Sequence, residues 1–312
     1  MTIIGIIVVI IFLGLLTTIY ITEVALISIY AYHKLRKQHH SNILIGRWPI
    51  MLHFIAAVGI IFFFYSYFIE PRWIEVTKLQ IRTSKLSQES FRIVQISDLH
   101  CYKKPLSENS MVEIINKLEP DIIVFTGDAI SLPLALPLFK ETMNNLKASL
   151  GKLAVYGNWE TQHWPGLDYY TGTDIKLLDA ETVELSKNNE TISVTGLNCD
   201  KPMLAESICR KLSNDHFNVF LYHYSDLIED IDKYNIDLYL CGHTHGGQIA
   251  LPFYGALITL SKFGKKYESG MYSVGNTTLY VNRGIGMDSF PAPRLRFFAR
   301  PEVTVFDIIP EN

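Results

Sequence analysis

The chain has 312 residues, a formal net charge of −3 and a mean hydropathy of +0.16. This length can hold one large domain with additional segments, and the slight acidic balance argues against a nucleic-acid-binding protein. The four cysteines show no spacing typical of a zinc site and require no disulfide framework.

Residues 1–70 are predicted to form a membrane anchor of two helices, about 3–31 and 48–69. Both runs are almost wholly apolar, with Glu23 as the main interruption of the first, and a bilayer core requires about 20 apolar residues in a helix. Their length and near absence of charge argue against a pair of buried core helices. The first run lacks the basic start and cleavage site of a signal peptide, so we expect it to be retained. Pro71 ends the second helix.

The rest of the chain is predicted to form one domain, 91–312, with 71–90 as a linker or first strand. Runs of β-branched and apolar residues indicate strands, and apolar residues at i, i+3, i+4 and i+7 indicate helices. The predicted strands are 91–97, 121–126, 153–156, 191–197, 217–222, 237–241, 271–274, 278–282 and 302–308. The predicted helices are 111–118, 136–150, 207–212 and 225–234. The alternation of the two kinds of element indicates an α/β fold.

Five of the predicted strands end in polar residues that can bind a cation. Ligands in open α/β sheets collect beyond the carboxyl ends of the strands, so these side chains can converge. Two histidines in a glycine-rich loop could be ordinary loop residues, but the recurrence of candidates at other strand ends favours a metal site. The candidates are Asp98, His100, Asp128, Asn158, His223, His243 and His245.

Seven protein ligands exceed what one ion accepts in tetrahedral or octahedral geometry. Two ions about 3.5–4 Å apart can share them if one carboxylate bridges the pair. Asp128 is the predicted bridge, because it lies between the other candidates in chain order and follows a glycine that permits close approach. The mixture of nitrogen and oxygen ligands favours transition metals over calcium or magnesium. We expect two divalent ions, manganese first, with iron or zinc as alternatives.

The candidate ligands and their neighbours resemble the five sequence blocks of the calcineurin-like metallophosphoesterases, from about Phe91 to Ile308. The blocks are Asp98-Leu99-His100, Gly127-Asp128, Gly157-Asn158, His223 and Gly242-His243-Thr244-His245. Three further segments resemble a membrane-associated bacterial branch of that family. They are Gly246-Gly247-Gln248, Arg283-Gly284-Ile285-Gly286 and Arg300-Pro301-Glu302.

The resemblance implies a four-layer α/β/β/α sandwich, which two transmembrane helices precede in this chain. It also implies how the ligands are divided between two metals. Asp98, His100 and His245 would hold one metal. Asn158, His223 and His243 would hold the other, with Asp128 between them.

The third block departs from the family pattern, because Trp159 stands where the family has a histidine that is assigned to protonating the leaving group. The indole N–H of tryptophan is only a hydrogen-bond donor. The leaving group could be good enough to need no acid, His163 or His100 could substitute, or catalysis could be weak. The similar UDP-2,3-diacylglucosamine pyrophosphatases also lack a histidine in this block, which favours the first explanation.

Two further features bear on the substrate. Four arginines could offset charge on a phosphoryl group: Arg283, Arg294, Arg296 and Arg300. Solvated surface charge is the alternative for each, and Arg283 is the predicted substrate-binding residue because it lies in a glycine-rich turn at a strand end.

An apolar segment beside the metal loop belongs either to the core or to an element that dips into lipid headgroups, with its lysines meeting anionic lipid. It comprises Phe253, Tyr254, Leu257, Ile258, Leu260 and Phe263, with Lys262, Lys265 and Lys266, and Phe290, Pro291, Phe297 and Phe298 could extend it.

The sequence thus predicts a membrane-anchored, two-metal phosphohydrolase that cleaves a phosphoester or pyrophosphate bond. The specific candidate reaction is hydrolysis of UDP-2,3-diacylglucosamine in lipid A biosynthesis. A phosphodiesterase or phosphatase acting on other phospholipids or envelope substrates is the rival enzyme, and a catalytically weak membrane scaffold is the alternative of another class. The expected partners are a phosphorylated, lipidic small molecule and the membrane, without nucleic acid.

The expected location is the inner membrane of a bacterium. The loop between the two spans and the segment after the second span each carry four lysines or arginines, so the positive-inside rule does not choose an orientation. Cys101 and Cys241 each lie near a suspected metal ligand, where oxidation would harm the site. They favour the cytoplasmic face for the main domain.

Overall fold

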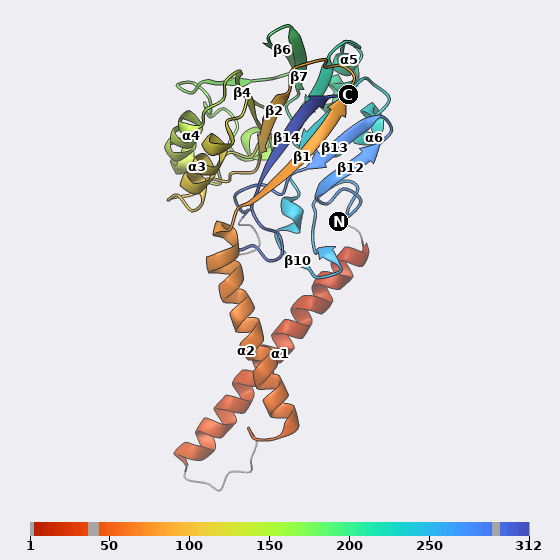
Figure 1. The fold of residues 1–312 in the computed structure, drawn as a ribbon. Helices are drawn as coiled ribbons and strands as arrows, with labels where there is room; N and C mark the ends of the chain where they lie inside the picture. Colours follow the sequence, from red (N-terminus) through yellow and green to blue (C-terminus); the bar gives the residue numbers. More distant parts are fainter. Residues whose placement is uncertain (1–2, 37–43, 289–293, 312) are drawn as a thin grey trace. The chain divides into compact units, whose positions relative to one another are not determined.

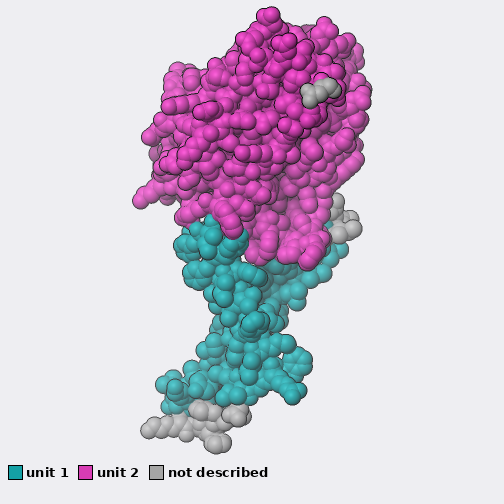
Figure 2. Space-filling model, in the orientation of Figure 1, with its two compact units in different colours: residues 1–69 teal, residues 70–312 magenta. Residues whose placement is uncertain are grey.

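The computed structural model describes residues 3–36, 44–288 and 294–311. The chain divides into two compact units, residues 1–69 and residues 70–312, which are coloured separately in Figure 2. Of the residues in the expected apolar segment, Phe290 and Pro291 lie outside the described part of the chain.

The first unit contains two helices that are long and apolar enough to cross a membrane. They are α1 (Ile3–Leu35) and α2 (Arg47–Phe64), and the second helical run continues to Arg72. The carboxylate of Glu23 in α1 lies 2.7 Å from Nδ1 of His53 in α2, so the ionisable residue in the first apolar run has a polar partner. The structure therefore confirms the predicted pair of apolar helices.

The second unit contains two six-stranded mixed sheets (Figure 1). The order of strands in the first sheet is β1 (Glu75–Thr83), β14 (Glu302–Pro310), β2 (Phe91–Ile96), β3 (Ile122–Phe125), β4 (Gly151–Ala154) and β5 (Ile175–Leu177). The order in the second sheet is β12 (Gly270–Val274), β13 (Thr277–Val281), β9 (Leu238–Cys241), β8 (Phe217–Leu221), β7 (Glu190–Gly196) and β6 (Glu181–Lys187). Strands β2 to β5 are parallel to one another, as are β7, β8, β9 and β13.

Three hydrophobic cores separate four layers. The first core lies between the first sheet and helices α3 (Glu108–Leu118) and α4 (Leu136–Asn145). The second lies between the two sheets, and the third lies between the second sheet and helices α5 (Ala205–Cys209) and α6 (Ile228–Ile231). The predicted four-layer α/β/β/α sandwich is therefore confirmed.

The strand sequences explain this layering. Along β2, Val94 and Ile96 pack in the core under the helices, whereas Phe91 and Ile93 pack in the core between the sheets. A strand that is covered on both faces requires apolar side chains at nearly every position, and β2 has them. The packing of the two sheets places the carboxyl ends of the parallel strands of one sheet next to those of the other. The candidate metal ligands follow these strand ends.

Some elements differ from the predicted ones. Strand β6 was not predicted because it is an edge strand with exposed polar side chains at alternate positions, and β5 is only three residues long. Helix α4 ends at Asn145 instead of Leu150, since the Nζ of Lys152 in β4 donates hydrogen bonds to the carbonyl oxygens of Met143 and Leu146. A buried lysine that satisfies the last carbonyls allows a helix to end without a glycine cap.

Candidate metal centre and active site

All seven predicted ligands lie at the carboxyl ends of parallel strands, and both sheets contribute. From the first sheet, Asp98 and His100 follow β2, Asp128 follows β3 and Asn158 follows β4. From the second sheet, His223 follows β8, and His243 and His245 follow β9. The packing of the two sheets brings the seven side chains together into two groups.

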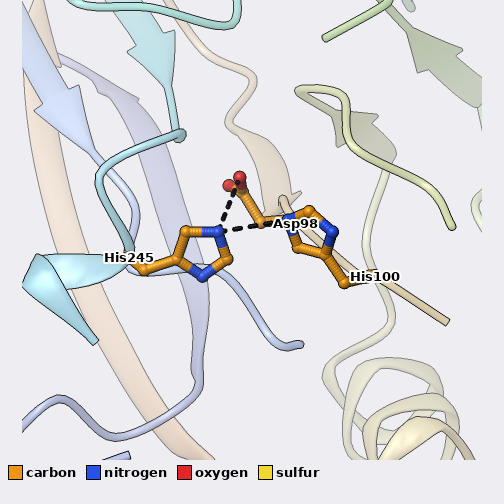
Figure 3. A group of neighbouring side chains, drawn as sticks. All are labelled: Asp98, His100 and His245. Atoms are coloured by element: carbon orange, nitrogen blue, oxygen red, sulfur yellow. Dashed lines mark hydrogen bonds and ion pairs between the residues drawn. The ribbon is translucent and has the colours of Figure 1, made fainter. Parts of the chain in front are cut away.

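The first group consists of Asp98, His100 and His245, whose side chains point toward one another from the segments that follow β2 and β9 (Figure 3). The Nε2 atoms of the two histidines are 3.2 Å apart, and Nε2 of His245 lies 3.4 Å from a carboxylate oxygen of Asp98. One ligand atom from each residue falls within 4.8 Å of the others. Two basic nitrogens this close to a buried carboxylate form a donor set that suits a divalent cation.

The second group consists of Asp128, His223 and His243, and Asn158 joins it. Nε2 of His223 lies 3.2 Å from Oδ2 of Asp128 and 3.0 Å from Oδ1 of Asn158. Nδ1 of His223 lies 2.7 Å from the carbonyl oxygen of Thr126. A histidine that donates its Nδ1 proton to a backbone carbonyl keeps Nε2 free for a metal, so this contact orients His223 as a ligand.

Asp128 lies between the two groups. Its Oδ2 atom is 3.5 Å from Nε2 of His100 in the first group and 3.2 Å from Nε2 of His223 in the second. Its other oxygen accepts a hydrogen bond from the backbone N–H of Trp159 at 2.9 Å. This is the position that a bridging carboxylate requires.

Burial sets the protonation of most of these histidines. It lowers the pKa of His100 to about 3 and that of His243 to about 4, and it lowers the pKa of His245 as well. For His223 burial acts in the same direction and is the largest single effect, but the charge of Asp128, the hydrogen bond to Asp128 and the charge of Asp98 together outweigh it and raise the pKa to about 10. Neutral imidazoles carry the lone pair that a cation needs, and a cation competes with the proton on His223.

The backbone at the site is strained in a way that the surrounding structure must support. Five of the seven candidate ligands have left-handed backbone angles, which are uncommon for residues other than glycine. Their φ values are 50° at Asp98, 40° at His100, 63° at Asp128, 70° at His243 and 52° at His245. Such strain concentrates at functional sites, at about 1–3 kcal/mol per residue.

Glu160 holds the loops that carry two of the ligands. Its buried carboxylate accepts hydrogen bonds from the backbone N–H groups of Asp128, Ala129 and Gly157, at 3.0, 2.5 and 2.7 Å. Burial and the nearby charge of Asp128 raise the pKa of Glu160 to about 7. Glu160 is thus a positioning residue that ties the end of β3 to the end of β4.

Replacement of Glu160 with alanine is expected to lower the free energy of unfolding by about 2–4 kcal/mol, because three buried N–H groups lose their acceptor. Equilibrium unfolding of the full chain in detergent measures this change. Glu113→Ala on the exposed face of α3 is the control and should leave the free energy of unfolding nearly unchanged. Equal effects of the two substitutions would contradict the role given to Glu160.

A cavity of about 540 Å³ opens over the candidate ligands. Trp159 and His163 lie in its wall, stacked with ring centroids 4.3 Å apart, and Trp159 also meets the ring of His100 edge to face at 5.2 Å. The two stacked residues begin and end a single π-helical turn, a conformation that is frequent at functional sites. The position of the family histidine is therefore filled by an indole, with His163 beside it.

The cavity wall also contains Ser131 and Trp164, which the sequence did not indicate, together with two residues of the predicted apolar segment. The hydroxyl of Ser131 lies 3.4 Å from Nδ1 of His100. Trp164, Ile258 and Leu260 add an apolar side to the wall. Ser131 could have been predicted, because it follows the candidate ligand Asp128 by only three residues. The apolar residues of the wall come from segments that are more distant from Asp128 in the chain.

Arg283 is placed differently from the expectation that it binds substrate. Its guanidinium lies 2.9 Å from a carboxylate oxygen of Glu75 and 3.2 Å from one of Glu302. It is not among the described residues that line the cavity. A glycine-rich turn at a strand end indicated the right edge of the sheet but not the direction of the side chain, which is paired with two carboxylates.

The other three arginines also have defined partners. Arg294 donates hydrogen bonds to the hydroxyl of Ser131 and to the carbonyl oxygen of His100, each at 3.0 Å, so it braces the cavity wall. Arg296 is fully buried, and Arg300 lies over the ring of Trp73. Solvated surface charge was therefore the wrong alternative for Arg296.

The apolar segment beside the metal loop divides between the two interpretations. Leu257 is buried, and Phe263 packs against the third core. Phe253 and Leu260 are exposed, as is Phe298 from the C-terminal part of the chain. One part of the segment therefore belongs to the core, and the other part forms a surface.

Comparison with known proteins agrees with this geometry. Residues 91–247 match the family model for the calcineurin-like phosphoesterases. The uncharacterized metallophosphoesterase YkuE of Bacillus subtilis is 37% identical over 266 residues, which cover 80% of this chain and 90% of that protein. The phosphodiesterase YaeI of Escherichia coli is 27% identical, covering 79% of this chain and 93% of its own.

A more distant relative has a named substrate. The UDP-2,3-diacylglucosamine pyrophosphatase LpxG of Chlamydia muridarum is 25% identical, covering 82% of this chain and 95% of its own. The range that matches the family model, residues 91–247, contains all seven strand-end residues of the two groups. The chain therefore belongs to the calcineurin-like metallophosphoesterases, a family of hydrolases that use a dinuclear site of divalent metal ions.

Proposed function

We propose that this protein is a membrane-anchored hydrolase that cleaves the pyrophosphate bond of an amphiphilic nucleotide sugar of the UDP-2,3-diacylglucosamine type. The observation that carries the proposal is the meeting of two ligand groups at Asp128 in a cavity with one apolar side. The two groups of metal-binding side chains would hold the phosphate end of such a substrate through bound cations. The apolar side of the cavity would contact its acyl chains.

The proposed site holds two divalent cations, with manganese as the first candidate. Asp98, His100 and His245 would hold one of them. Asn158, His223 and His243 would hold the other, and Asp128 would contact both. When bound, such a pair supplies Lewis acidity toward phosphoryl oxygens and toward water.

The protein's own residues orient this chemistry. The carbonyl oxygen of Thr126 fixes the ring of His223, and Glu160 holds the backbone of Asp128 and Gly157. The stacked rings of Trp159 and His163 form one side of the cavity. These contacts pre-organise the site before substrate arrives.

The nature of the leaving group follows from Trp159. An indole cannot donate a proton as an acid at neutral pH, so the site suits a leaving group that is already a weak base. A nucleotide phosphate released from a pyrophosphate meets this requirement. The name of the distant LpxG relatives supports the same class of substrate.

The second candidate is a phosphodiesterase that acts on other phospholipids or envelope polymers. The specific observation in its favour is His163, which lies in the cavity wall against Trp159 and could protonate a poorer leaving group. The name of the relative YaeI supports this class.

A panel assay of the full chain with manganese in detergent distinguishes the candidates. The substrates are UDP-2,3-diacylglucosamine, a set of phospholipids and bis-nitrophenyl phosphate. Release of UMP is the expected result. Hydrolysis of phospholipids without release of UMP would favour the second candidate, and no hydrolysis by protein with two bound metals would indicate a scaffold.

Substitution of histidine for Trp159 tests the leaving-group argument. Turnover of esters with poor leaving groups is expected to rise by about 10²-fold, within the range that a positioned general acid contributes. Turnover of activated nitrophenyl esters should change little, because their leaving group needs no proton. Steady-state rates of Trp159→His on both kinds of ester measure this difference, and Trp159→Phe is the control that changes the ring without adding an acid.

A further inference from the structure

Four apolar side chains on the surface form a rim, which we define as Phe253, Ile258, Leu260 and Phe298. Their exposed fractions are 110%, 36%, 64% and 55%. Phe253 lies in the turn of the hairpin formed by β10 (Ala250–Leu251) and β11 (Gly255–Ala256). Single exposed apolar residues are normal on protein surfaces. A group of them on connected segments can mark a binding surface, so the structural connection between the members of the rim is what matters.

Backbone hydrogen bonds join the two segments that carry the rim. The N–H of Ala250 donates to the carbonyl oxygen of Phe297 at 2.8 Å, and the N–H of Phe297 donates to that of Gln248 at 3.0 Å. The hairpin and residues 297–298 are therefore one unit of structure. Ile258 and Leu260 also line the cavity, so the rim borders the opening of the active site.

The rim is also bonded to Glu70, the first residue of the second unit. The second apolar helical run extends to Arg72, so Glu70 lies in its last turn. The fully buried carboxylate of Glu70 accepts hydrogen bonds from the N–H groups of Phe298 at 3.0 Å and Ala299 at 2.6 Å. Phe298 is therefore bonded to a residue in the last turn of a helical run that is long and apolar enough to cross a membrane.

Trp73, which follows the helical run directly, and its partner Arg300 are residue types that are common at a membrane interface. Trp73 is 53% exposed, and the guanidinium of Arg300 lies 4.2 Å from the centroid of its ring. Tryptophan and arginine are enriched where a chain leaves the hydrocarbon core. Figure 1 shows the β10 hairpin at the end of the domain from which β1 starts, and the β6–β7 turn at the other end.

We propose that the rim inserts into the headgroup layer of the bilayer that holds the anchor, and that the active site takes its substrate from that lipid surface. Lys262, with its Nζ 5.2 Å from the ring of Phe263, adds a positive charge next to Leu260 for anionic headgroups. The identity of the substrate rests on the proposed function. The docking of the rim does not, because it depends only on exposed apolar side chains tied to Glu70.

Depth-dependent quenching of a fluorescent label tests the docking. The full chain is reconstituted in vesicles of phosphatidylcholine and phosphatidylglycerol, and Phe253→Cys is labelled with an environment-sensitive dye. The four native cysteines are buried. Asn189→Cys is the matched control, because it lies exposed in the turn between β6 and β7, at the end of the domain away from the β10 hairpin (Figure 1).

The label at residue 253 should show blue-shifted emission and at least about threefold stronger quenching by spin-labelled lipid than the label at residue 189. Equal quenching at both positions would overturn the proposal. Emission that shifts with protein concentration and is insensitive to spin-labelled lipid would also overturn it, because a second copy of the chain would then cover the rim.

A second measurement connects the rim with catalysis. Phe253→Ser should reduce hydrolysis of substrate embedded in vesicles by about tenfold, because a buried phenylalanine contributes strongly to partitioning. Hydrolysis of soluble bis-nitrophenyl phosphate should stay unchanged, since Phe253 is not among the described residues that line the cavity. An equal loss on both substrates would overturn the link to the lipid surface. Absence of all hydrolysis in the unsubstituted protein would contradict the proposed function, while the label would still report docking.

Discussion

Replacement of Asp128 with alanine is expected to remove both metal ions together and to lower kcat/KM by at least about 100-fold. Groups that only orient metal ligands already contribute about 10–100-fold, and Asp128 is proposed to be a ligand of both ions. The structural basis is its Oδ2 atom, which lies within 3.5 Å of a ligand atom in each group. Metal analysis of the purified, dialysed protein measures the content directly, with about two ions per chain expected before substitution.

The control for Asp128 is Asp98→Ala. Asp98 belongs to the first group alone, so its loss should reduce the content to about one ion per chain. Asp128→Asn tests the same point in a variant with an unchanged side-chain shape, which guards against a loss of folding. Full metal content in both Asp128 variants would show that this residue is not the bridge.

Replacement of Arg296 with methionine is expected to lower the free energy of unfolding by at least about 3 kcal/mol, because each buried carbonyl oxygen that is left without a donor costs about 1–3 kcal/mol. The guanidinium is fully buried and donates hydrogen bonds to five backbone carbonyl oxygens. These belong to Arg283, Gly284, Gly286, Ala299 and His245, at distances of 2.5–3.5 Å. Without Arg296, these carbonyl oxygens would lose a donor in a place that water reaches poorly.

Denaturant unfolding of the full chain in detergent measures this effect through the transition midpoint. Arg210→Met is the matched control, because the side chain of Arg210 is 67% exposed and its loss should leave the midpoint nearly unchanged. A midpoint for Arg296→Met that equals the midpoint of this control would contradict the structural role. Metal content should fall in Arg296→Met as well, since the same guanidinium contacts the backbone of His245.

The candidate ligands could be identified from the sequence because their signal is local. Each follows a short apolar strand directly, as Asp128 follows the run that ends at Phe125. The carboxyl ends of parallel strands share one edge, so the strand order did not have to be known for convergence to be expected. The membrane helices were equally accessible, since their length and composition are properties of continuous segments.

Side-chain direction and long-range pairing were not accessible in this way. The sequence alone does not show that Arg283 turns to Glu75 and Glu302, or that Arg296 is buried. These outcomes depend on carbonyl oxygens and carboxylates that come from other parts of the chain. The hydrogen bonds from the backbone of Asp128 and Gly157 to Glu160 could not be predicted either. They form only after β3 and β4 pair, because the donors follow different strands.

The sequence by itself therefore determined the two apolar helices, the alternation of strands and helices, and the types of residue available for metal binding. It also predicted Asp128 as the bridge, and the family resemblance implied the division of the ligands that the structure shows. Only the tertiary structure decided that Phe253 and Phe298 are exposed while Leu257 is buried. The physical reason is that strand and helix patterns arise from contacts between neighbours in sequence. Distances between ligand atoms and the burial of single side chains arise from the packing of two sheets whose contacts span the whole domain.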